Sequence, residues 1–110
     1  GKTDRQIARE LMRREGHDDA AIDARLDAVI AGYLERLRRE VSDGSRHFTA
    51  LAGVEALLDA LEPRDDVVLG LLTGNVAEGA AVKLGSAGLD IGRFRVNAFG
   101  SDHEHRPELP

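Results

Sequence analysis

Residues 67–75 read VVLGLLTGN, and this stretch decides the fold of the chain. Its first six residues are a continuous apolar run without polar alternation, which is typical of a strand buried on both faces in a parallel sheet. The run leads directly into Thr73, Gly74 and Asn75. These three residues are therefore expected at the carboxyl end of the strand, the edge at which open parallel sheets bind ligands.

The segments on either side of this run predict a βαβ unit. A helix is expected over residues 76–87 with Gly88 as its stop, followed by a second strand over residues 94–99. The order strand, helix, strand implies parallel pairing and an α/β fold class. A short helix over residues 54–61 precedes the unit, and a polar turn at residues 64–66 joins them. The apolar residues expected to be buried by this short helix are Val54, Leu57, Leu58 and Leu61.

Two amphipathic helices are predicted before this unit. Thr3 stands three residues before Gln6, a capping-box spacing, and Gly16 is a natural stop for the first helix. The second helix is expected to start at Asp18 or Asp19 and to form an antiparallel hairpin with the first. Its buried stripe is predicted from apolar residues at three- and four-residue steps, namely Ile22, Leu26, Val29, Ile30, Tyr33, Leu34, Leu37 and Val41.

The amino-acid composition excludes several classes of protein function. The formal net charge of −5 argues against a nucleic-acid-binding surface, which normally carries net positive charge. The chain has no cysteine, which excludes disulfides and thiolate chemistry. No apolar run has the length of a membrane-spanning helix, and the first residues are too charged for a signal peptide. We therefore expect a cytoplasmic protein with neither a membrane nor a nucleic acid as partner.

Thr73, Gly74 and Asn75 form the strongest candidate binding site. A threonine hydroxyl, a glycine that allows close backbone approach, and the amides at the start of a helix suit an anion such as a phosphate. The same triplet also suits a structural role, in which Thr73 caps the helix and Gly74 makes the turn. The triplet alone does not separate these interpretations.

The wider pattern resembles the haloacid dehalogenase superfamily of hydrolases, and within it the phosphoglycolate-phosphatase-like members. LLTGN at residues 71–75 resembles the family's second motif, in which the hydroxyl and the following amides hold the transferred phosphoryl group. LAGVEALLDAL, AVKLGSAGLDIGRF and GSDHEHRPELP are similar to the segments around it, so the resemblance runs from Phe48 to the end. The resemblance implies a helical cap over residues 1–47 and part of a Rossmann-like core over residues 48–110.

The implied activity is that of a magnesium-dependent phosphatase acting on a small phosphorylated metabolite, phosphoglycolate-like by resemblance. The family needs a cation near the phosphate. Arg106, followed by a proline as in the family's basic-residue loop, is the first candidate, and Lys83 is the rival. The family's nucleophilic Asp-x-Asp-Gly-Thr motif and its later acidic magnesium ligands do not occur in these residues. The resemblance thus implies an excerpt of a longer enzyme, inactive by itself.

Other interpretations remain open at this stage. Within the superfamily, a phosphomutase or a dehalogenase has the same threonine motif, and outside it the chain could be a non-catalytic module that binds an anion or a protein partner. Residues 1–4, GKTD, resemble the start of the cap and are candidates for the mouth of the site, although Thr3 also serves as a helix cap. Residues 102–105, DHEH, offer four possible metal ligands, but neighbouring side chains seldom face one ion. The sequence leaves the oligomeric state open.

Overall fold

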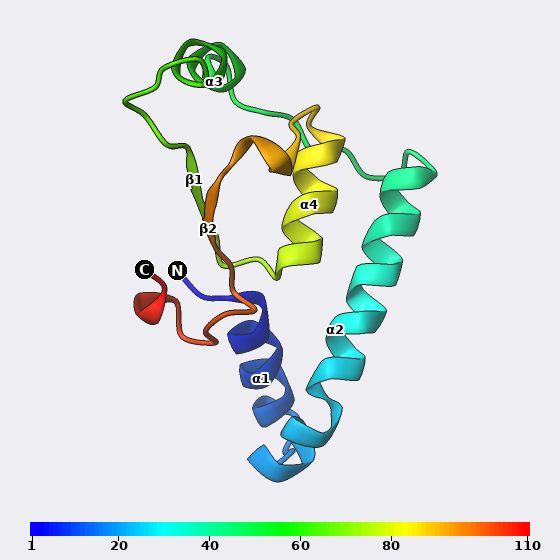
Figure 1. The fold of residues 1–110 in the computed structure, drawn as a ribbon. Helices are drawn as coiled ribbons and strands as arrows, with labels where there is room; N and C mark the ends of the chain where they lie inside the picture. The colour runs from blue at the N-terminus through cyan, green and yellow to red at the C-terminus, as the bar shows by residue number, and fades with distance from the viewer.

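The computed structural model describes residues 1–110 as a long helical hairpin joined to a small parallel strand pair (Figure 1). Four α-helices, two strands and two 3-10 turns follow one another along the chain. They are α1 (Asp4–Arg14), α2 (Asp19–Ser42), α3 (Val54–Leu61), β1 (Gly70–Leu72), α4 (Ala77–Ser86), η1 (Ile91–Arg93), β2 (Val96–Ala98) and η2 (Arg106–Glu108).

The hairpin of α1 and α2 follows from local sequence signals. The Thr3 side chain accepts a hydrogen bond from the Gln6 amide at 3.2 Å, and the Asp18 carboxylate accepts one from the Ala21 amide at 2.8 Å. Gly16 follows α1 with φ +90°, a left-handed conformation that side chains with a Cβ avoid. Both predicted helices and their N-cap residues are confirmed, but the Gln6 side chain donates to Glu10 and not back to Thr3, so the capping box is only half formed.

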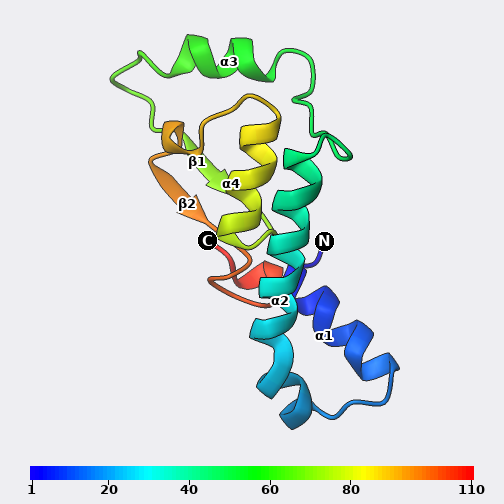
Figure 2. The ribbon, with the colours of Figure 1, turned by 90° about the vertical axis from the view of Figure 1, so that its right-hand side faces the viewer.

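Only part of the predicted stripe on α2 is buried. Ile22 and Leu26 are almost fully buried, and Leu34 and Leu37 are also in the core. Val29 is 43% exposed because α1 and α2 diverge, as Figure 2 shows, and leave the middle of the hairpin open.

The strand pair is parallel, as predicted. Gly70 pairs with Val96 and Leu72 with Ala98, and α4 connects the two strands. In Figure 1, α4 lies between the strand pair and α2. An ion pair between Arg38 of α2 and Glu78 of α4, at 2.7 Å, joins the segment before residue 48 to the one after it. The chain is therefore a mixed helix-and-sheet protein of the α/β kind.

The expectation of a strand over residues 67–72 buried on both faces is wrong. The strand covers only Gly70–Leu72, and Val68 and Leu72 are 60% and 52% exposed. The two-stranded sheet has α4 on the Leu71 side, whereas the opposite face, with Leu72 and Val96, is open. An apolar run therefore predicts a strand buried on both faces only where other elements pack against both faces of the sheet.

The buried face predicted for α3 is also largely wrong. The helix occupies residues Val54–Leu61 as expected, but Leu58 is its only buried residue and Leu57 is 59% exposed. In Figures 1 and 2, α3 lies beyond the amino ends of the strands, away from the other helices. Arg93 of η1 holds it through ion pairs with Asp59 and Glu62, at 2.7 and 2.8 Å. None of the helices is long and apolar enough to cross a membrane.

We expect acid to weaken the junction of α1 and α2. The Asp19 carboxylate accepts hydrogen bonds from the Arg13 guanidinium at 2.9 and 3.1 Å, and these bonds hold the pKa of Asp19 below its ordinary value of 3.8. A carboxylate with a lowered pKa stabilises the fold above its ordinary pKa, and that contribution is lost as pH falls through the lowered value. Thermal unfolding between about pH 6 and pH 2 should therefore show a smaller acid loss for Asp19→Asn than for the unchanged chain. Equal acid losses would contradict this role for Asp19.

Candidate functional site

Thr73 stands where sequence analysis placed it, directly after β1 at the carboxyl end of the parallel pair. Its amide donates to the Ala98 carbonyl at 3.0 Å, which continues the strand ladder by one bond. The loop after β2 lies against the loop after β1, because the Gly100 amide donates to the Asn75 carbonyl at 2.8 Å. Both loops thus meet at one edge of the sheet, on the side where the chain begins and ends (Figure 1).

A chain of hydrogen bonds connects Thr73 to a lysine. The Lys83 ammonium donates to Asn75 Oδ1 at 2.6 Å, and Asn75 Nδ2 donates to Thr73 Oγ1 at 2.7 Å. These side chains line a cavity of about 110 Å³ with Leu71, Ala80 and Leu84. Sites for drug-sized ligands usually measure roughly 300–1,000 Å³. The cavity therefore suits a small polar group and not a whole metabolite.

Lys83 is held between aromatic rings. Its Nζ lies 6.0 Å from the centroid of the Tyr33 ring on α2 and 5.7 Å from that of the Phe48 ring. Both distances are within the range of cation–π attraction, and Lys83 is half-buried. Aromatic contact and the bond to Asn75 keep the ammonium group beside Thr73. This environment differs from that of a freely solvated helix lysine.

The backbone amides of the loop are largely engaged within the chain. The Asn75 amide donates to Thr73 Oγ1 at 3.1 Å, which makes the structural turn that sequence analysis weighed as an alternative. The Val76 amide donates to the Asp4 carboxylate at 3.1 Å, and the Ala77 amide to Ser101 Oγ at 3.3 Å. The Gly74 amide makes no hydrogen bond. A ligand that used all of these amides would have to displace side chains.

Residues 2 and 3 pack so closely against Gly74 that no larger residue fits at this position. The residue is buried, and a Cβ on it would lie 2.7 Å from the Lys2 carbonyl oxygen and 3.3 Å from Thr3 Cα. The close backbone approach predicted at Gly74 therefore exists, but the approaching group is residues 2–3 and not a ligand. The GKTD segment does lie at the edge of the site, as sequence analysis considered.

Arg106 lies apart from the Thr73 hydrogen bonds. It begins η2 and is exposed, and its side chain forms no hydrogen bond or ion pair. Its guanidinium lies against Gly1, where a Cβ would be 3.1 Å from Nη1. The structure thus brings Lys83 to Thr73 and leaves Arg106 at the neighbouring N-terminal segment.

Residues 102–105 serve to fix the loop after β2. The Asp102 carboxylate accepts from the Phe99 amide at 2.7 Å, and Glu104 pairs with Arg9 of α1 at 2.8 Å. Thr3 Oγ1 donates to the Glu104 carbonyl in addition to capping α1. The Glu104 bond contributes most to raising the pKa of Arg9. The structure contains no group of three or more acidic, histidine or cysteine side chains placed to hold a metal ion.

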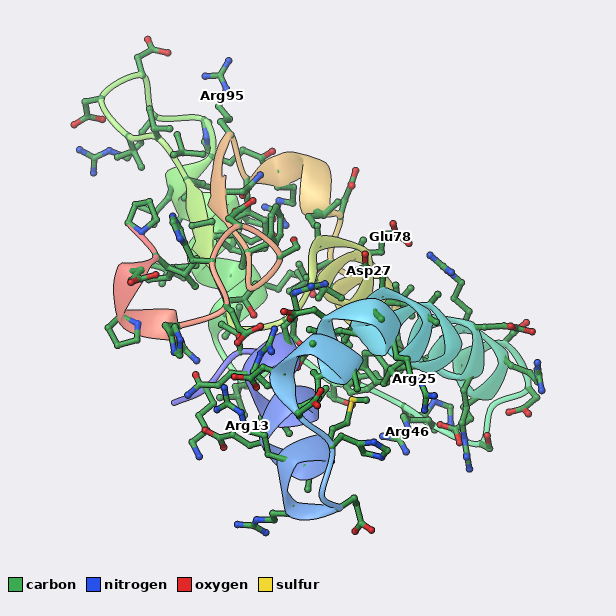
Figure 3. The ribbon with its side chains drawn as sticks, turned by 90° about the horizontal axis from the view of Figure 1, so that it is seen from below. Arg13, Arg25, Asp27, Arg46, Glu78 and Arg95 are labelled. Atoms are coloured by element: carbon green, nitrogen blue, oxygen red, sulfur yellow. The ribbon has the colours of Figure 1, made fainter.

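A larger cavity of about 330 Å³ lies at the opposite, amino end of the strands. Arg64, Arg93 and Arg95 line it, which suggests an anion site at first sight. Arg93 already forms ion pairs with Asp59 and Glu62. Arg64 is paired with Asp66 at 2.7 Å. Arg95 points away from the body of the protein in Figure 3. The Thr73 loop is therefore the better candidate.

Three contributors to the site were not predicted from the sequence, namely Tyr33, Phe48 and Asp4. Tyr33 was assigned to the buried stripe of α2, and no periodic pattern indicates that its ring faces a lysine fifty residues later. Asp4 was considered only as part of the GKTD segment, whereas its carboxylate reaches Val76 across 72 residues of chain. Such contacts depend on how the hairpin packs on α4, which local sequence does not encode.

Comparison of the chain with models of known protein families and with curated proteins finds no match.

Proposed function

We propose that the chain is the phosphate-binding part of a hydrolase resembling the haloacid dehalogenase superfamily, with Thr73 and Lys83 at its centre. The observation that carries the proposal is the continuous set of hydrogen bonds from Lys83 through Asn75 to Thr73 Oγ1 at the carboxyl end of a parallel strand. In this proposal residues 1–47 are the helical cap and residues 48–110 part of a Rossmann-like core.

The arrangement suits a phosphoryl group for electrostatic reasons. Thr73 Oγ1 accepts from Asn75, so its own proton is free to be donated to a phosphate oxygen. Lys83 supplies a positive charge that offsets the negative charge of the phosphate and of its transition state. A cavity of about 110 Å³ has room for a small anion only, so the rest of a phosphorylated metabolite would lie outside it.

The proposal assigns no metal ligand to these residues. Magnesium is expected from the family resemblance, but the acidic side chains of the chain do not gather into a metal site. Its ligands and the nucleophilic aspartate are therefore proposed to come from other segments of the whole enzyme, and the chain's own role is to bind and orient the phosphoryl group.

The test is hydrolysis of an aryl phosphate. A longer polypeptide that carries residues 1–110 after an Asp-x-Asp strand should release phosphate in the presence of magnesium and lose this activity with a chelator. Residues 1–110 alone should show no turnover. Absence of hydrolysis by the longer polypeptide would favour a non-catalytic anion-binding module. Release of halide from a haloacid, or transfer of phosphate between sugar positions, would favour a dehalogenase or a phosphomutase.

The same assay separates the two candidate cations. Lys83→Met should lower kcat/KM by about 100-fold, because an electrostatic donor beside the phosphate is lost. Arg106→Met should lower kcat/KM by less than about threefold, as expected for an exposed arginine outside the hydrogen-bonded set. The opposite order of effects would assign the catalytic cation to Arg106.

A further inference from the structure

We propose that Tyr33 of α2 is a positioning residue for the Lys83 cation, and that its ring holds the ammonium group without neutralising it, so that the charge stays available to a phosphate. This inference rests on the proposed function, in which Thr73 and Lys83 form the phosphate site. It is carried by the place of the Tyr33 ring on α4 and by the kinds of groups that surround the ammonium.

The Tyr33 ring is held against α4 by close helix packing. Figure 2 shows α2 beside α4, and Gly79 of α4 is buried. A Cβ on Gly79 would lie 3.8 Å from Tyr33 Cε1 and 3.5 Å from Leu34 Cδ2. Lys83 follows Gly79 by four residues, so both lie on the same face of α4. The Lys83 Nζ lies 6.0 Å from the centroid of the Tyr33 ring, and a side chain of α2 therefore reaches the cation of α4.

The Lys83 ammonium has several partners, but none of them carries a negative charge. A second ring, that of Phe48, has its centroid 5.7 Å from Nζ, and the polar partner is the neutral Asn75 Oδ1 at 2.6 Å. Lys83 takes part in no ion pair. The other lysine of the chain, Lys2, is by contrast paired with Glu10 at 2.6 Å.

This set of partners suits a cation that must attract a ligand. The face of an aromatic ring attracts a cation through its quadrupole but has no net charge. A carboxylate at the same place would also attract the ammonium, but it would cancel much of the field that a bound anion feels. The rings and the amide oxygen therefore fix the position of the Lys83 charge and leave it for a phosphate beside Thr73. Because Tyr33 belongs to α2, the packing of the hairpin on α4 sets where this charge lies.

Inorganic phosphate titrated into the 110-residue chain, followed by the amide resonances of Gly74 and Asn75, tests the proposal. Tyr33→Leu keeps an apolar side chain against Gly79 but removes the aromatic face. It should weaken phosphate binding about fivefold, as expected when a single cation–π contact is lost. Tyr33→Phe keeps the ring and should bind phosphate within about twofold of the unchanged chain.

Arg38→Met is the matched control for helix packing. It removes the ion pair with Glu78, which also joins α2 to α4, and leaves both rings in place. Its phosphate affinity should stay within about twofold of the unchanged chain, since an exposed ion pair contributes little to stability. An effect as large as that of Tyr33→Leu would mean that helix packing alone matters at Lys83, and would overturn the proposal.

The lysine side chain gives a measurement that depends neither on phosphate nor on the folding of a variant. The chain has two lysines, Lys2 and Lys83, so the ε-methylene resonances of one are a reference for those of the other. In the unchanged chain, the ring protons of Tyr33 should show nuclear Overhauser contacts with the methylenes of Lys83 and none with those of Lys2. The Lys83 resonances should also lie upfield of those of Lys2, and Tyr33→Leu should reduce this difference.

Absence of the contacts between Tyr33 and Lys83 would overturn the proposal. Equal phosphate affinity of Tyr33→Leu and a phosphate-binding unchanged chain would do the same, as would equal weakening by Tyr33→Leu and Tyr33→Phe. If the contacts are present but phosphate shifts no amide of the unchanged chain, the phosphate site is rejected while Tyr33 is still supported as the residue that positions Lys83.

Discussion

Thr73→Ala should lower the kcat of the longer, aspartate-bearing polypeptide by about 100- to 1,000-fold in the aryl phosphate assay. Loss of a single positioned donor to a developing oxyanion has effects of this size. The hydroxyl also accepts hydrogen bonds from the amide and the side chain of Asn75. Its removal therefore frees Asn75 and loosens the contact to Lys83 as well.

Thr73→Ser is the matched control, because it keeps the hydroxyl and removes only a methyl group. We expect its kcat to stay within about tenfold of the unchanged protein. If Thr73→Ala and Thr73→Ser had equal activities, the hydroxyl would have no part in the reaction and the site assignment would be wrong.

Gly100→Ala should cost about 3 kcal/mol of unfolding free energy and separate the two loops of the site. Gly100 is buried, and a Cβ on it would overlap the Gly74 carbonyl, with its carbon at 2.7 Å and Thr3 Cβ at 3.1 Å. The obstacle is backbone, so no side-chain rotation relieves it, and forced overpacking has costs of this size. Chemical denaturation with circular dichroism measures the change.

Gly85→Ala provides the contrasting variant. Gly85 lies near the end of α4, is exposed, and has open space where its Cβ would be. Alanine there should stabilise the protein by about 0.5–1 kcal/mol, because glycine has the higher conformational entropy in the unfolded chain. A Gly100→Ala variant as stable as Gly85→Ala would mean that the contact between the loops is not part of the folded protein.

The helices could be predicted from the sequence because their signals are local. Thr3 and Asp18 cap the two helices of the hairpin, and Gly16 and Gly44 follow them in left-handed conformations. The parallel pairing of β1 and β2 was also predictable. Parallel strands need a long crossover connection, and the ten-residue helix α4 provides it.

The burial of the strands and the hydrogen bonds within the site could not be predicted in the same way. Leu57 and Leu72 are apolar, yet both are exposed, because no element of the chain covers them. The bonds from Lys83 to Asn75 and from Asp4 to Val76 depend on how α4 and the hairpin dock on each other. The threonine loop was therefore predictable from the sequence, but the order of the two candidate cations was not: Arg106 was the first candidate, whereas the structure places Lys83 beside Asn75.

The most direct test of the central claim is a titration of the 110-residue chain with inorganic phosphate, followed by amide resonances. Phosphate bound between Thr73 and Lys83 should shift the amides of Gly74 and Asn75 first, and Thr73→Ala should abolish these shifts. Shifts confined to Arg64, Arg93 and Arg95 at the opposite end of the strands, or shifts at Gly74 that persist in Thr73→Ala, would contradict the account.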